Sequence, residues 1–241
     1  MQKGDLISIA FTGKDVTTGK IFDTTDAETA QKEGMTASKK QWGPIPIIVG
    51  SGEILPGLDE CLQGMKAGET KKIVLEPAHA FGERNPQLIR VLPLSEFTKN
   101  KVSPIPGTIV NANDMLGKVQ SVSGGRVRVD FNPDLAGKKV EYEIKVVEHY
   151  TEAKAQLDAL VKKAFPAWEK PHVKHEKDVI EVQAPIKEMT KIQRNVPGFA
   201  KMVMDVIKGT KEVKVTTLFT PEDFAKMHTH EDGSTHWDNE H

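Results

Sequence analysis

The sequence predicts an α+β protein built from three parts. Segments of alternating polarity recur through the first 149 residues, and one short helical pattern interrupts them at residues 56–65. After residue 150, helical and strand patterns alternate. We therefore expect a β-rich unit with one helix packed on its sheet, a small β-rich inserted domain, and a C-terminal α+β domain. The expected boundaries are 1–85 plus 132–150, 86–131 and 151–227, with a flexible His-rich tail at 228–241.

The length and composition fit a multidomain globular protein. The chain has 241 residues, of which 38% are hydrophobic and 28% charged. A net charge of −1 without a basic cluster argues against a nucleic-acid or membrane-surface partner. The N-terminus is too polar for a signal peptide, and no apolar run is long enough for a bilayer span. The single cysteine, Cys61, excludes an internal disulfide and predicts a cytoplasmic location.

The first unit has a strand at 5–12, a turn and second strand at 17–25, and a third strand at 45–49. Between them, residues 26–44 are polar and predict a long loop, in which one helical turn is left open. Pro56 and Gly57 open a short helix that extends to Met65. Cys61 lies on the apolar face of this helix and is either a core thiol or a reactive one. The segment "TKKIVLEPA" predicts the next strand.

The segment "ILPGL" at 54–58 places large apolar residues around a Pro-Gly pair. Ile54 and Leu55 are adjacent, so a half-buried strand would point one of them at water. The stretch is therefore either core on all sides or the lining of a hollow.

Residues 86–131 contain short alternating strands, with a hairpin turn at Gly124-Gly125. The long alternating strand at 138–149 then places Val140, Tyr142, Ile144 and Val146 on one face. Such a strand needs a sheet, and the first unit lacks a closing strand, so 86–131 is interpreted as an insertion. Helical patterns at 151–165 and 197–209 alternate with strands at 178–184 and 212–219, whereas "KPHVKHEKD" is expected to be a linker or loop.

Five motifs in order carry a family resemblance: "FTG" at 11–13, "IFDTT" at 21–25, "VGSGEILPGLDECLQGMKAGE" at 49–69, "AFGE" at 80–83 and "LAGKKVEYEIKVVEH" at 135–149. Together they resemble the FKBP-type peptidyl-prolyl cis-trans isomerases. The insertion directly after "AFGER" is similar to the SlyD-like branch, in which an insert-in-flap domain interrupts the isomerase domain. The extra C-terminal domain looks like that of long archaeal members.

The resemblance implies a bent antiparallel sheet that wraps a short helix, with an apolar pocket between them. It implies catalytic roles for Asp23, Phe81 and Tyr142. It also implies a substrate-binding wall made of Phe11, Phe22, Ile45, Ile47, Ile54, Leu55 and Leu58. Two positions depart from many members: Leu58 replaces tryptophan at the pocket floor, and Phe81 replaces tyrosine, which removes a hydroxyl donor.

An apolar pocket suits the implied reaction, which breaks no bond and transfers no proton. The barrier is the loss of amide resonance, on the order of 18–20 kcal/mol. The twisted amide is less polar than the planar one, so a water-poor site favours it. No cofactor is needed. Asp23 either orients the substrate or is a turn aspartate bonded to local backbone.

The insert and the tail leave alternatives open. The apolar residues of the insert are either its core or a groove for unfolded chains, which the SlyD-like resemblance also implies; the candidates are Leu92, Phe97, Ile109, Met115 and Leu116. His228, His230 and His236 lie in an acidic tract that is either solvated or weakly metal-binding. The expected partners are unfolded or nascent polypeptides that contain proline, and the C-terminal domain is a candidate homodimer surface. The competing interpretation is a non-catalytic holdase chaperone.

Overall fold

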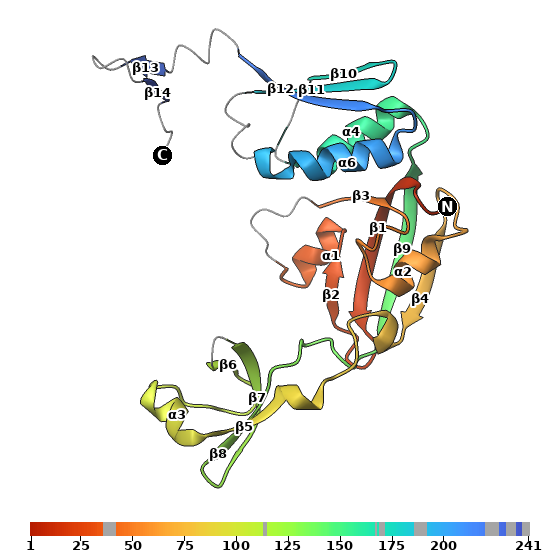
Figure 1. Cartoon of the computed structure of the whole chain (residues 1–241). Coiled ribbons are helices and arrows are strands. Elements are labelled where there is room, and N and C mark those ends of the chain that lie inside the picture. Colours follow the sequence, from red (N-terminus) through yellow and green to blue (C-terminus); the bar gives the residue numbers. More distant parts are fainter. Residues whose placement is uncertain are drawn as a thin grey trace.

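The computed structural model arranges the chain as three parts along a bent molecule, with the insert at one end and the C-terminal domain at the other (Figure 1). The fold class is α+β, as predicted from the sequence. The structure describes residues 1–35, 42–112, 115–166, 168, 172–185, 192–219, 227–229 and 235–237. Within this part of the chain, no helix has both the length and the hydropathy needed to cross a membrane.

The central sheet belongs to the first unit and is antiparallel throughout. Its strands are β1 (Leu6–Asp15), β2 (Ile21–Thr24), β3 (Ile45–Ile48), β4 (Thr70–Leu75) and β9 (Val140–His149). The order is β2-β1-β9-β4, and β3 pairs with the first half of β1. The chain therefore returns from the insert to the first sheet, as its alternating pattern predicted, and β9 lies between β1 and β4. Val140, Tyr142, Ile144 and Val146 are all buried on one face of β9.

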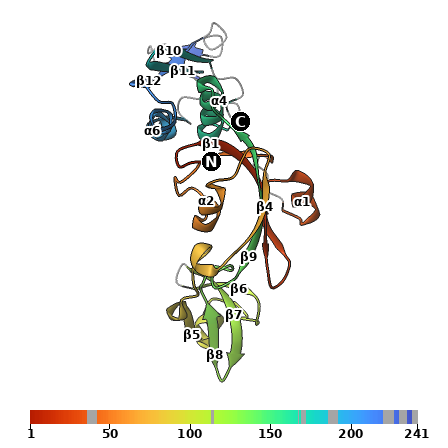
Figure 2. The same ribbon diagram turned by 90° about the vertical axis from the view of Figure 1, so that its right-hand side faces the viewer.

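Two short helices lie on opposite sides of this sheet (Figure 2). Helix α2 (Pro56–Leu62) begins with Pro56 in its first turn and packs Leu58, Cys61 and Leu62 into the sheet's core. It ends three residues before the predicted Met65, which is nevertheless buried in the same cluster. Burial raises the pKa of the Cys61 thiol, which favours the core interpretation over a reactive one.

Helix α1 (Ala27–Lys32) lies in the segment that was expected to be a loop with one helical turn. The Asp26 carboxylate caps it by accepting a hydrogen bond from the Thr29 backbone N–H at 2.8 Å. A 3₁₀ turn, η1 (Pro77–His79), follows β4 and leads to Phe81.

The insert forms its own four-stranded sheet in the order β5-β8-β7-β6. Its elements are η2 (Pro86–Leu88), β5 (Ile89–Pro93), α3 (Leu94–Lys99), β6 (Ile109–Ala112), β7 (Met115–Ser123) and β8 (Arg126–Asp130). Gly124 and Gly125 both have positive φ angles, 56° and 72°, and make the predicted two-residue hairpin turn. The sequence did not predict α3, because Phe97 is its only buried residue and no helical period is visible.

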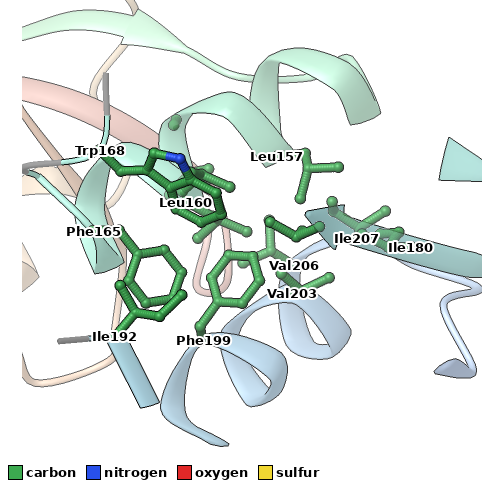
Figure 3. Close-up of a cluster of buried hydrophobic side chains, with 14 of the residues drawn as sticks. Leu157, Leu160, Phe165, Trp168, Ile180, Ile192, Phe199, Val203, Val206 and Ile207 are labelled. Carbon is green, nitrogen blue, oxygen red and sulfur yellow. The ribbon is translucent and has the colours of Figure 1, made fainter. Parts of the chain in front are cut away.

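The C-terminal domain packs two helices on one face of a three-stranded sheet. Its elements are α4 (Ala153–Ala164), β10 (His172–Glu176), β11 (Val179–Pro185), η3 (Gln193–Asn195), α6 (Val196–Val206) and β12 (Glu212–Leu218). Figure 3 shows its core, in which Phe165 lies 5.1 Å from Phe199 and 5.5 Å from Trp168 between ring centroids. "HVKHE" is an edge strand and not the expected loop; only Val173 is partly buried, so its composition is polar.

Part of the His-rich tail forms an antiparallel pair, β13 (Met227–Thr229) with β14 (Thr235–Trp237), which its polar composition did not predict.

Residues at one end of the central sheet belong to the core of the C-terminal domain. Leu6 of β1 is 0% exposed and lies in the same buried cluster as Leu157 and Phe199. Ile48 and Tyr150 pack against that cluster as well. Strand β1 thus contributes Leu6 to one core and Ile7 to the other, because successive side chains of a strand point to opposite faces.

Candidate active site

Aromatic rings from four separate segments meet on the central sheet. Phe22 of β2 lies edge-on to Tyr142 of β9, with ring centroids 5.7 Å apart and planes at 82°. Phe81, which follows η1, lies edge-on to Phe22 at 5.6 Å and 83°. Phe11 of β1 completes the cluster 5.9 Å from Tyr142. Edge-to-face contacts of this kind are favourable, and Phe11, Phe22 and Phe81 stay partly exposed, so the cluster opens to solvent.

The structure brings the predicted apolar wall into this same cluster. Ile47 and Leu58 are buried in it, whereas Ile45, Ile54 and Leu55 are only partly buried. The segment "ILPGL" is therefore not core on all sides. Ile54 and Leu55 are partly exposed and pack against the buried cluster that contains Ile47 and Leu58.

Tyr142 forms the buried centre of the site. Its side chain is 3% exposed, and burial is the main reason why its pKa lies well above its ordinary value. The negative charge of Asp23 raises this pKa further. The phenol therefore keeps its proton at every physiological pH. Asp23 and Tyr142 both pair with Gly13 of β1, from the β2 side and the β9 side respectively.

Gly13 is a site residue that the sequence reasoning did not single out. A Cβ atom at this position would lie 2.7 Å from Cε1 of Tyr142 and 3.0 Å from Cζ of Phe22. Both distances are below van der Waals contact, so only a residue without a side chain lets both rings pack against β1. The signal was present in "FTG", where a glycine interrupts a strand pattern.

Asp59 of α2 holds the loop that leads to Ile54 and Leu55. Its carboxylate accepts hydrogen bonds from the backbone N–H of Gly50 at 2.7 Å and of Gly52 at 3.4 Å. Both glycines have φ of +75°, which is unfavourable for other residues. The spacing "GSGE…LD" contained this signal, but the sequence alone did not indicate that the aspartate faces back to the loop.

Two hollows lie outside this site. One, of about 330 Å³, is lined by Ala10, Thr25, Asp26, Ala27, Trp42, Gly43 and Pro44. The other, of about 390 Å³, is in the insert and is lined by Val91, Leu92, Pro93, Gly124, Gly125 and Arg126. Neither contains Asp23, Phe81 or Tyr142, so the site is defined by its converging rings and not by these hollows.

The five predicted groove residues of the insert do not share one surface. Phe97 is 4% exposed and belongs to the insert's core, so its assignment to a groove is wrong. Leu92 and Met115 are partly buried against that core. Ile109 and Leu116 are 67% and 70% exposed on the opposite face of the sheet. Alternation explains the division, because Val110 and Gly117 point inward next to them.

The histidines of the tail are only partly placed. His228 and His236 are opposite each other in the β13–β14 pair, and His230 lies outside the described residues. Across the part of the chain that is described, no three potential metal ligands gather in one place.

Comparison with known proteins gives two family matches. Residues 1–97 match the model of the FKBP-type peptidyl-prolyl cis-trans isomerase, and residues 90–135 match that of the FKBP26 IF domain.

Several curated relatives carry isomerase names, among them the following three. The short-type peptidyl-prolyl cis-trans isomerase of Methanocaldococcus jannaschii is 32% identical over 61% of this chain and 92% of its own length. The FKBP-type 16 kDa peptidyl-prolyl cis-trans isomerase of Escherichia coli K12 is 31% identical over 54% and 84%. The FKBP-type peptidyl-prolyl cis-trans isomerase SlyD of Helicobacter pylori is 26% identical over 43% and 58%.

Proposed function

This chain belongs to the FKBP-type peptidyl-prolyl cis-trans isomerases, and on that premise we propose that it rotates X-Pro bonds in unfolded and nascent polypeptides at the aromatic site. The observation that carries the proposal is the cluster of Phe22, Phe81 and Tyr142, which is open to solvent and adjoins Asp23. It combines an apolar surface for a proline ring with one negative charge.

The site lowers the barrier by its environment and not by a reactive group. Rotation removes amide resonance, which costs on the order of 18–20 kcal/mol in water. The twisted amide has lost its charge-separated resonance form, so partly buried rings disfavour the planar ground state relative to it. The protonated Tyr142 phenol is a hydrogen-bond donor, and the Asp23 carboxylate orients the peptide through its N–H groups or its partial charges.

The experiment for the site compares Asp23→Ala and Tyr142→Phe with the wild type in two assays. One measures turnover of a proline tetrapeptide, and the other measures proline-limited refolding of a whole protein. We expect kcat/KM to fall about 10- to 100-fold for Asp23→Ala, because the carboxylate that orients the peptide is lost. This fall corresponds to about 1.4–2.8 kcal/mol of transition-state stabilisation. Asp158→Ala, an exposed aspartate on α4, is the matched control. If Asp23→Ala turned over the tetrapeptide at the wild-type rate, Asp23 would have only a structural role in its turn.

The insert is proposed to hold unfolded chains next to this site. Ile109 and Leu116 are diagonal neighbours on the solvent face of β6 and β7, and Val91 on β5 is 59% exposed. Exposed apolar residues of this size favour contact with apolar segments of a client. Holding a client there raises the effective concentration of its prolines at the catalytic site. This refines the predicted groove to the outer face of the sheet.

The double variant Ile109→Ser/Leu116→Ser tests this division of labour. We expect tetrapeptide turnover to stay at the wild-type value, whereas suppression of aggregation and catalysis of refolding decrease. Val74→Ser removes an exposed aliphatic residue from β4, outside the insert, and is the control. If the double variant lost tetrapeptide turnover, the insert would be part of the catalytic unit.

The alternative function is a holdase without catalysis, and the exposure of Ile109 and Leu116 is what favours it. The two functions separate in the Asp23→Ala variant. If the chain is a holdase, the wild type and Asp23→Ala both suppress aggregation, and neither of them accelerates proline-limited refolding.

The location and assembly proposed for the chain rest on fewer observations. A reducing cytoplasm suits a chain whose one cysteine is buried and unpaired.

A homodimer through the C-terminal domain is supported by Met204, which is 42% exposed on α6. Light scattering of the full chain and of Met204→Glu measures the oligomeric state, and a monomeric wild type would end this part of the proposal.

A further inference from the structure

A lysine of the C-terminal domain contacts two residues that adjoin the isomerase site. Lys163, in the last turn of α4, donates a hydrogen bond from Nζ to Oε2 of Glu53 at 2.7 Å and to the backbone carbonyl of Pro46 at 3.0 Å. These partners are 110 and 117 residues away in sequence. The Lys163 and Glu53 side chains are 21% and 29% exposed, so the ion pair is partly withdrawn from water.

Both partners of Lys163 adjoin residues of the substrate-binding wall. Pro46 lies between Ile45 and Ile47 in β3, and Glu53 directly precedes Ile54 and Leu55. One ammonium group therefore links the two chain segments that supply four of the wall residues. Charge-assisted hydrogen bonds are among the stronger ones, and two of them fix the separation of these segments.

The loop between β3 and α2 is thus held from two sides. Asp59 binds Gly50 and Gly52 from α2, and Lys163 binds Glu53 from α4. The glycines of this loop have a large conformational freedom to lose, so each restraint narrows the positions that Ile54 and Leu55 take.

Helix α4 is itself a firm support for Lys163. Its residues Leu157, Leu160 and Val161 are buried in the core of the C-terminal domain, and Leu6 and Ile48 of the central sheet adjoin the same core. The position of Lys163 is therefore fixed relative to β1 and β3.

We propose that Lys163 is a positioning residue of the isomerase site. Through it, the C-terminal domain holds Ile54 and Leu55 in the positions at which they contact the substrate. The inference rests on the proposed use of the aromatic site. It assigns the C-terminal domain a part in substrate binding in addition to any role in assembly.

Four variants of the full chain test this role: Lys163→Met, Lys163→Arg, Glu53→Gln and the double variant Lys163→Met/Glu53→Gln. Methionine keeps the apolar stem and removes the charge. We expect Lys163→Met to raise KM for a proline tetrapeptide about three- to tenfold with kcat within about twofold, because the wall contacts substrate in the ground state and transition state alike. Lys163→Arg keeps the positive charge, so its KM should stay close to the wild-type value. The KM of the double variant should not exceed that of the more impaired single variant, because Lys163→Met and Glu53→Gln each remove the same ion pair.

Lys162→Met is the matched control, because Lys162 is the exposed neighbour on the same helix. Its KM stays at the wild-type value. An unchanged KM in Lys163→Met overturns the proposal. A fall in kcat and thermal midpoint without a change in KM also overturns it, since that result reports a structural role only. An inactive wild type would instead refute the proposed function, so the two failures are distinguishable.

Discussion

Gly13→Ala is the sharpest test of how the aromatic site is packed. The added methyl group would lie 2.7 Å and 2.9 Å from Cε1 and Cζ of Tyr142, and 3.0 Å from Cζ of Phe22. Carbon atoms prefer separations of about 3.5–4.0 Å, so the rings must move by roughly 0.5–1 Å. Overpacking of this kind costs about 1–3 kcal/mol. If the site bears the whole cost, kcat/KM falls roughly 5- to 150-fold.

The assay is tetrapeptide turnover together with thermal unfolding of the same preparations. Gly198→Ala is the control, because a Cβ there meets nothing within 4 Å and the residue lies in helix α6. Alanine favours a helix over glycine by about 1 kcal/mol, so this control keeps full activity with equal or higher stability. A Gly13→Ala protein with wild-type turnover and an unchanged thermal midpoint would refute the packing argument.

Three further predictions follow from buried groups. Tyr142 keeps its proton in the folded protein above its ordinary pKa of 10.0, so the free energy of unfolding is unaffected by this group below about pH 10 and falls above it. Urea unfolding between about pH 8 and 11 should show a steeper decline in the wild type than in Tyr142→Phe, and equal slopes would contradict the assignment. Leu6→Ala should destabilise the C-terminal domain by about 2–5 kcal/mol, measured by tryptophan fluorescence during denaturation in a Trp42→Phe/Trp237→Phe background, where only the buried Trp168 emits; a normal transition would place Leu6 outside that core. Asp130→Ala removes a buried acceptor that binds Arg84, Gln120 and Asn132, so amide exchange in β7 and β8 should accelerate while tetrapeptide turnover persists.

The fold could be predicted from the sequence where one periodicity dominates. Strand β9 alternates from Val140 to Val146, and every predicted inward residue is buried. Helix α3 and strand β10 were not predicted, because α3 withdraws only Phe97 and, in part, Leu94 from water, and β10 half-buries only Val173, which is too few residues to show a period. The tertiary environment, and not the local pattern, decides the conformation of such segments.

The resemblance to the FKBP-type isomerases implied the apolar members of the site, and the structure gathers them in one cluster. The roles of residues that matter through their three-dimensional neighbours were not predictable. Gly13 matters because two rings approach it, and Lys163 because α4 reaches β3. Neither approach leaves a pattern in the sequence. In the insert, Phe97 and Ile109 are equally apolar, and only the three-dimensional fold separates core from surface.

The position of β9 beside β1 has a consequence for biosynthesis. The two strands pair from Ile7 with His149 to Asp15 with Val140, so the earliest strand made has its main neighbour more than half a chain later. While the ribosome is still translating, residues 86–131 already contain every strand of their own sheet and can close it first. The growing polypeptide can therefore expose a finished insert, which we propose holds client chains, before the central sheet is complete.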